Sequence, residues 1–118
     1  MTIKQIIDAK PVLDRIAQNK EIPTKVAYKI YILLSSLNPA IQFFLDKRKE
    51  LFLNYGKEDG ENFVITEENQ LIFSQKFDEL MDIECTNEIQ KIDISLDVDL
   101  GISPSEIFLL ESFINFIE

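Results

Sequence analysis

The chain lacks the residues on which most enzyme active sites depend. It contains no histidine, one cysteine and three glycines among 118 residues. Histidine is the side chain best suited to proton transfer near neutral pH, and the few glycines form neither a P-loop nor a GxGxxG turn. No Cys/His spacing typical of a metal site occurs. We therefore expect a non-enzymatic protein without cofactor or metal. A catalyst built from carboxylates alone stays open, but no pair of acids stands out.

The sequence also lacks features of secreted and membrane proteins. Its single Cys85 cannot form an intrachain disulfide, which is typical of a reducing compartment, and the alternation of residues around it indicates a small core residue. The N-terminal MTIKQIIDAK places charges where a signal peptide needs an apolar run. The longest uncharged window, residues 30–45, has 16 residues and includes polar ones, too few and too polar to cross a bilayer. We predict one cytoplasmic domain, residues 1–118, without membrane contact.

Charge is unevenly divided along the chain. Residues 1–56 hold nine Lys/Arg and five Asp/Glu, a net of +4, whereas residues 57–118 hold three Lys and sixteen Asp/Glu, a net of −13. The two halves either neutralise each other in the fold, which we favour, or steer a partner. The cations are few and interleaved with acids, which argues against direct nucleic-acid binding.

Residues 23–55 carry the longest regular pattern. Apolar side chains recur there every three or four residues, as on one side of an α-helix: Val26, Ile30, Leu33, Leu37, Ile41, Phe44, Leu51 and Tyr55. Pro39 either kinks this helix or, with Asn38 as N-cap, begins the second helix of a hairpin. The unbroken phase from Leu37 to Ile41 favours the kink.

Shorter elements flank this helix. Pro11 predicts a turn ending near Ala9 and then a helix over 11–19. Gly56 predicts a left-handed helix cap followed by a loop over 56–62. Residues 63–65 are typical of a short strand. Thr66 is then the predicted N-cap of a helix over 67–81. The residues expected on its buried side are Leu71, Ile72, Phe73, Phe77, Leu80 and Met81.

The last third of the chain changes period. Alternation from Ile92 to Leu100 predicts a strand with one buried face, with a shorter strand over 83–85 and a turn at Thr86–Asn87 before it. Ser103 and Glu106 form a capping box for an apolar helix over 104–117. The predicted fold is therefore α+β and helix-dominated, with a long, Pro-kinked central helix, two or three short strands and an apolar C-terminal helix.

Two groups of side chains are candidates for partner binding. Asp93, Asp97 and Asp99 fall on the solvent face of the predicted strand. They fail as a calcium loop, because its sixth and twelfth positions would be Val98 and Pro104, so they are a solvated face or part of an acidic surface that mimics nucleic acid. That surface would add Asp78, Glu79, Asp82 and Glu84.

The second group lies on the C-terminal helix. Phe113 and Phe116 belong to a helix so apolar that it is either central to the core, which we favour, or covered by a second subunit.

Three segments carry a resemblance: IPTKVAYK at 22–29, KEL to YG at 49–56, and ISPSE at 102–106. Together they resemble a family of small uncharacterised proteins from tailed phages and prophages of Gram-positive bacteria, over most of residues 22–117. Pro39 departs from the uninterrupted helix expected of that family. The resemblance implies a phage origin but no activity and no site residues. We expect a small acidic phage accessory protein that contacts another protein, with homo-oligomerisation open. An anti-defence inhibitor with a nucleic-acid-like acidic surface is the alternative.

Overall fold

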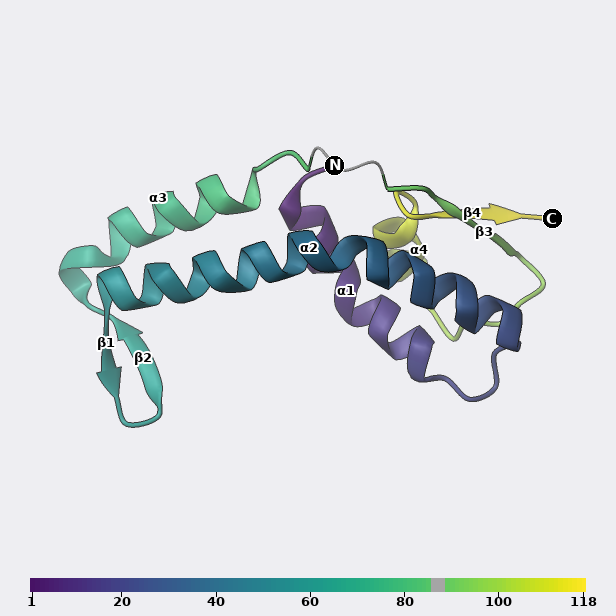
Figure 1. Ribbon diagram of the computed structural model, residues 1–118, viewed down its shortest axis with the longest axis horizontal. Helices are drawn as coiled ribbons and strands as arrows, with labels where there is room; N and C mark the ends of the chain where they lie inside the picture. Colours follow the sequence, from purple (N-terminus) through teal and green to yellow (C-terminus); the bar gives the residue numbers. More distant parts are fainter. Residues whose placement is uncertain (86–88) are drawn as a thin grey trace.

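Helix α2, Thr24–Tyr55, is the axis of the structure (Figure 1). The computed structural model describes residues 1–85 and 89–118. With 32 residues, α2 is about 48 Å long at 1.5 Å per residue, and the longest dimension of the molecule is 53 Å. The predicted apolar stripe is its buried face: Val26, Ile30, Leu33, Leu37, Ile41 and Phe44. The long central helix and the helix-dominated α+β class are confirmed.

Pro39 lies inside α2 without interrupting it, so the helical-hairpin alternative is wrong. A proline removes one backbone hydrogen bond from a helix interior. The buried residues on either side, Leu37 at 0 % and Ile41 at 4 % exposure, keep the same face of the helix against the core. Packing of this continuous stripe therefore outweighs the lost bond.

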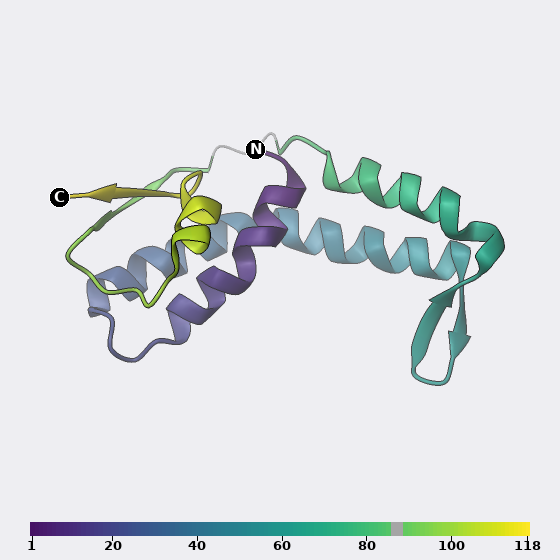
Figure 2. The ribbon, with the colours of Figure 1, turned by 180° about the vertical axis from the view of Figure 1, so that it is seen from behind.

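The elements divide into two parts along α2 (Figures 1 and 2). The body comprises α1 (Ile3–Gln18), the N-terminal half of α2, α4 (Pro104–Leu110) and the strands β3 (Ile92–Ser95) and β4 (Ile114–Ile117). The arm comprises the C-terminal half of α2, α3 (Gln70–Met81) and the hairpin of β1 (Gly56–Asp59) and β2 (Asn62–Ile65). The radius of gyration, 17.0 Å, exceeds the roughly 13.5 Å of a compact chain of this length. The protein is therefore elongated.

The main core lies in the body. Its fully buried side chains come from α1, α2, β3, the end of α4 and the segment after it: Ile6, Leu13, Ile16, Ile30, Leu33, Leu37, Ile94, Leu110, Phe113 and Ile114. The second cluster, at the junction with the arm, buries Ile3, Phe44 and Leu80. The arm is thus much less deeply packed than the body.

Helix α1 is continuous through Pro11, so the predicted break near Ala9 is wrong. A capping box begins the helix, since Thr2 Oγ1 accepts from the Gln5 N–H and Gln5 Oε1 accepts from the Thr2 N–H. Ala9 and Val12 then continue a buried face that runs past the exposed proline.

The segment after α2 is a β-hairpin and not the predicted loop. Gly56 has extended backbone (φ −107°) and opens β1, so the prediction of a left-handed cap is wrong. A Cβ there would lie 2.7 Å from the Phe52 carbonyl oxygen, which accounts for the glycine. Asp59 pairs with Asn62, and Gly60 supplies the positive φ (67°) of the tight turn between them. The predicted strand over 63–65 is confirmed within β2.

Helix α3 follows a short 3₁₀ turn, Glu67–Asn69, in place of the predicted single helix over 67–81. Thr66 precedes this turn, but its side chain makes no capping hydrogen bond. The prediction that Leu71 and Ile72 are buried is wrong, since they are 73 % and 39 % exposed. A two-helix arm covers only one side of α3, so only Leu80 of the predicted set is fully buried.

The predicted strand over 92–100 ends at Ser95, because the chain turns there. The Val98 N–H donates to the Ser95 carbonyl (3.1 Å). Residues 83–85 are not a strand: Glu84 makes an isolated bridge to Thr2. The predicted turn at Thr86–Asn87 lies outside the described residues.

The predicted C-terminal helix is also shorter than expected. Its capping box at Ser103 and Glu106 is confirmed, but α4 ends at Leu110 and the chain then forms β4. Strand β4 pairs in parallel with β3, from Ile92 opposite Ile114 to Ser95 opposite Ile117. The apolar run therefore supplies a strand as well as a helix.

Candidate functional site

In the described parts of the chain, no three His, Cys, Asp or Glu side chains are placed to hold a metal ion. Cys85 is half-buried beside both apolar clusters. Burial raises the pKa of its thiol, which the N-terminal ammonium partly opposes. A raised pKa leaves less thiolate at neutral pH, so the thiol is a poor nucleophile.

Among the helices that the structure describes, none combines the length and apolar character needed to cross a bilayer.

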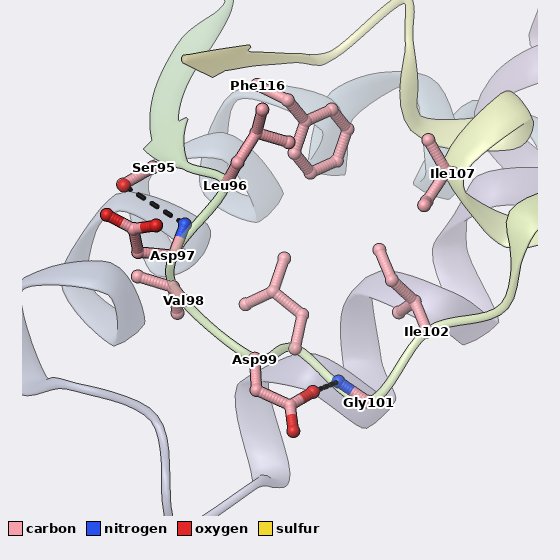
Figure 3. A pocket seen from close by; sticks show the side chains of 10 residues that line it. Ser95, Leu96, Asp97, Val98, Asp99, Gly101, Ile102, Ile107 and Phe116 are labelled. Atoms are coloured by element: carbon pink, nitrogen blue, oxygen red, sulfur yellow. Dashed lines mark hydrogen bonds between the residues drawn. The ribbon is translucent and has the colours of Figure 1, made fainter. Parts of the chain in front are cut away.

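A hollow of about 320 Å³ lies beside the loop over residues 95–102 (Figure 3). We call it the loop hollow. Its apolar wall consists of side chains from this loop, from α4 and from β4: Leu96, Val98, Leu100, Ile102, Ile107 and Phe116. Leu96 is 60 % exposed, and Ile107 is also exposed, whereas Leu100 is buried beneath the loop. The hollow is therefore an open apolar depression on the body.

Local hydrogen bonds fix the shape of this loop. The Ser95 Oγ accepts from the Asp97 N–H (3.2 Å), and the Asp99 carboxylate accepts from the Gly101 N–H (2.9 Å). Gly101 has a φ of +67°, a conformation that favours glycine. Each of these side chains accepts from the backbone N–H two residues later and so stabilises a turn. These turns give the loop a defined shape without regular secondary structure.

An ion pair joins the far end of the loop to α1. Arg15 lies 2.6 Å from the Glu106 carboxylate and donates to the Gly101 carbonyl (3.4 Å). The Arg15 guanidinium and the Ser103 backbone N–H lower the pKa of Glu106 to about 2. The same pair raises the pKa of Arg15. The cationic and acidic halves therefore meet at this point.

The loop places an acidic surface beside the apolar one. Asp97 and Asp99 are exposed, and a second hollow of about 510 Å³ on their side is also lined by Asn19 and Glu21. In Figure 3 both carboxylates lie at the rim, away from the apolar wall. The loop thus has one apolar and one anionic side.

The fold brings three of the five predicted partner residues to this loop hollow: Asp97, Asp99 and Phe116. Asp93 lies on β3, where its carboxylate accepts from the Asn115 amide (3.0 Å). The predicted single row of aspartates is wrong because the strand ends at Ser95. Phe113 is 0 % exposed and lies in the core, the alternative that the sequence analysis favoured, so in this structure it offers no surface to a partner.

Leu96 and Ile107 are the site residues that sequence reasoning missed. Alternation through Leu96 predicts a buried strand residue, yet the turn after Ser95 leaves it exposed. The signal that could identify the turn is local: Ser95, Asp97, Asp99 and Gly101 are all turn-forming residue types.

A third hollow, of about 370 Å³, lies between α2 and α3 in the arm. Phe43, Leu51, Leu80 and Ile83 contribute its apolar surface. Its charged residues form pairs along each helix, Lys47 with Glu50 (3.2 Å) and Lys76 with Glu79 (3.8 Å). These charges sum to zero, so the arm hollow lacks the anionic character of the loop.

The loop hollow is suited to binding a partner side chain. An apolar side chain fits its wall, and a neighbouring cation fits the carboxylates. Comparison of the chain with protein-family models, curated proteins and solved structures finds no match.

Proposed function

We propose that this chain is a small, non-enzymatic accessory protein that acts by contacting another protein through the loop hollow. The observation that supports this most is the position of an exposed apolar side chain, Leu96, beside the carboxylates of Asp97 and Asp99. The partner segment would insert an apolar side chain against Leu96, Ile107 and Phe116. An adjacent Lys or Arg would pair with the aspartates.

The two kinds of contact contribute differently. Each CH₂ group removed from water contributes about 0.8 kcal/mol, whereas an exposed ion pair contributes about 0–1 kcal/mol. Affinity would therefore come mainly from the apolar wall. The aspartates would favour basic partners and speed association, an effect that salt weakens.

The proposal includes the setting implied by the resemblance at residues 22–29, 49–56 and 102–106. The protein would act in the cytoplasm of a bacterial host as a phage accessory protein. Its partner would be a host or phage protein.

Selection from a random peptide library on the immobilised protein tests the binding proposal. We expect enrichment of peptides with a large apolar residue next to Lys or Arg. Leu96→Ser should weaken binding of the selected peptides at least tenfold, and Asp97→Lys should weaken it by a smaller factor that declines as the salt concentration rises. Asp46→Lys makes the same charge change on the exposed side of α2 and should leave binding unchanged. Absence of enrichment, or equal binding by all variants, would contradict the proposal.

The alternative is an anti-defence inhibitor whose acidic surface occupies the nucleic-acid site of an immune protein. The net charge of −13 over residues 57–118 favours it. Its weakness is that Asp93, Asp97 and Asp99 do not form the regular row that a phosphate backbone presents. Reversing these three residues to Lys should abolish inhibition, and unchanged inhibition would exclude this surface.

A further inference from the structure

The side of α2 that faces away from the core carries a regular stripe of its own. Its residues follow one another at steps of three or four, so they share one side of the helix, opposite the buried stripe. All of them are exposed, and Figures 1 and 2 show α1 crossing α2 on one side only. We call this set the outer stripe: Lys25, Tyr28, Ile32, Ser35, Pro39, Phe43, Asp46 and Glu50.

The middle of the outer stripe carries no charge, which is unusual for a helix face in water. No Asp, Glu, Lys or Arg occurs from Ile30 to Leu45, although 28 % of the chain is charged. Tyr28, Ile32 and Phe43 are 64 %, 44 % and 42 % exposed. A helix face left to water ordinarily carries charged and polar residues, and clustered exposed apolar side chains mark a contact surface. The outer stripe therefore has the character of a surface that another helix covers.

The outer stripe is complementary to its own reverse. Lys25 and Glu50 lie equally far from the midpoint between residues 37 and 38, and so do Ile32 and Phe43. When two copies of α2 lie antiparallel with these midpoints together, Lys25 of each copy faces Glu50 of the other. In the same arrangement Ile32 faces Phe43. One register thus brings together both the opposite charges and the apolar side chains.

The other four residues fit this register to within one position. Tyr28 lies opposite Asp46, whose carboxylate can accept a hydrogen bond from the phenol hydroxyl. Ser35 lies opposite Pro39 at the centre of the contact. Both side chains are small, so the two helix axes can approach to the lower end of the usual separation of about 8–10 Å. No pair in this register is therefore repulsive.

We propose that the outer stripe is a dimer interface, on which α2 of a second copy packs antiparallel around a two-fold axis at the midpoint. Each copy presents the same residues to the other, as a two-fold contact requires. The contact removes Ile32 and Phe43 of both copies from water at once. Residues 57–118 contribute nothing to the outer stripe, so the half of the chain with a net charge of −13 supplies no interface residue.

Charge distinguishes the antiparallel arrangement from a parallel one. In a parallel pair Lys25 would face Lys25, and Asp46 and Glu50 would each face their own copies. The antiparallel arrangement replaces these repulsions by two Lys25–Glu50 pairs. Glu50 also pairs with Lys47 of its own helix (3.2 Å), and exposed ion pairs contribute little free energy. The charges therefore set the direction of the second helix, and the apolar pairs supply the affinity.

This inference goes beyond the proposed function, since it uses the outer side of α2 and not the loop hollow. Failure of the peptide selection would leave the dimer untouched, and failure of the dimer would leave peptide binding untouched. In the dimer each end of α2 lies beside the opposite end of the other copy. Distances within a single α2 are therefore measured on labelled chain diluted with an excess of unlabelled chain.

Engineered cysteines test the register in a Cys85→Ala background. Opposed Cα atoms on two packed helices are about 4–6 Å apart, within disulfide range. A mixture of the Lys25→Cys and Glu50→Cys chains should therefore give a cross-linked dimer on a non-reducing gel in a glutathione redox buffer. Each variant incubated alone is the matched control and should stay monomeric, because its two cysteines would be about 38 Å apart. Cross-linking of the separate variants, or none in the mixture, would overturn the antiparallel contact.

Mass measurement tests the contact without cysteine variants. Light scattering over a concentration series should show the unmodified chain rising from 13.7 kDa to twice that mass. Ile32→Glu places a carboxylate against Phe43 of the other copy, and it should remain at 13.7 kDa with an unchanged circular dichroism spectrum. Leu71→Glu adds the same charge at an exposed residue of α3 and should still dimerise. A monomer of the unmodified chain at every concentration, or dimerisation of Ile32→Glu, would overturn the proposal.

Discussion

Replacing Leu37 by Ala removes a side chain from the centre of the buried stripe on α2. Leu37 is 0 % exposed and belongs to the main core. Loss of three buried carbons costs about 2.4 kcal/mol in transfer free energy, and the cavity left behind adds to this. Leu→Ala changes in protein cores cost about 3–5 kcal/mol in total. We therefore expect Leu37→Ala to lower the free energy of unfolding by about 3 kcal/mol.

This loss corresponds to a large change in melting temperature. The entropy of unfolding is about 2.1 cal/mol/K per residue, or about 250 cal/mol/K for 118 residues. A loss of about 3 kcal/mol then lowers the Tm by about 12 °C.

Thermal and urea denaturation followed by circular dichroism would measure both quantities. Leu71→Ala is the matched control, because Leu71 is 73 % exposed on α3, and it should change stability by no more than about 0.5 kcal/mol. Equal effects of the two substitutions, or a loss below about 1 kcal/mol for Leu37→Ala, would refute the assignment of the core.

Three further predictions test individual contacts. Glu106 has a pKa lowered to about 2 by Arg15, so its contribution is present above the ordinary pKa and is lost as the pH falls toward 2. Glu106→Gln keeps the helix cap but lacks the titrating carboxyl, so its stability should not change with pH through this group. The difference in Tm between the unmodified protein and Glu106→Gln should therefore shrink from pH 5 to pH 2. Gly56→Ala places a Cβ 2.7 Å from the Phe52 carbonyl oxygen and should destabilise the fold by about 1–3 kcal/mol in urea titrations. Pro39→Ala should raise stability by about 2 kcal/mol, because alanine favours a helix interior by about 3 kcal/mol and part of that gain is offset in the unfolded chain. A destabilised Pro39→Ala variant would contradict a continuous α2.

Patterns that rest on neighbouring residues could be read from the sequence. The stripe from Val26 to Phe44 keeps its period over five turns, and burial along one face follows directly. The capping box at Ser103 and Glu106 is equally local and was predicted correctly. Pro11 misled because packing of the rest of α1 outweighs its missing N–H.

Elements that depend on distant partners could not be read in the same way. Residues 114–117 are apolar enough for a helix, and only pairing with β3, some 20 residues earlier in the chain, makes them a strand. Leu71 fits a helical stripe, but burial depends on how many neighbours surround α3. Composition cannot supply that number.

The candidate site likewise combines local features, which the sequence predicts, with long-range ones, which it does not. Asp97 and Asp99 could be identified as exposed carboxylates because they alternate with apolar residues. Their position beside Phe116 and Ile107 depends on the turn after Ser95 and on the return of β4.

The most direct test of the fold is the distance between the two ends of α2, which holds the body and the arm apart. Spin labels at Lys25 and Asn54, both exposed, in a Cys85→Ala background can be measured by pulsed electron paramagnetic resonance. A continuous helix through Pro39 separates these positions by 29 residues, or about 44 Å. We predict a single narrow distribution near that distance. A distribution below about 20 Å would mean that the chain reverses at Asn38–Pro39 and would contradict the account.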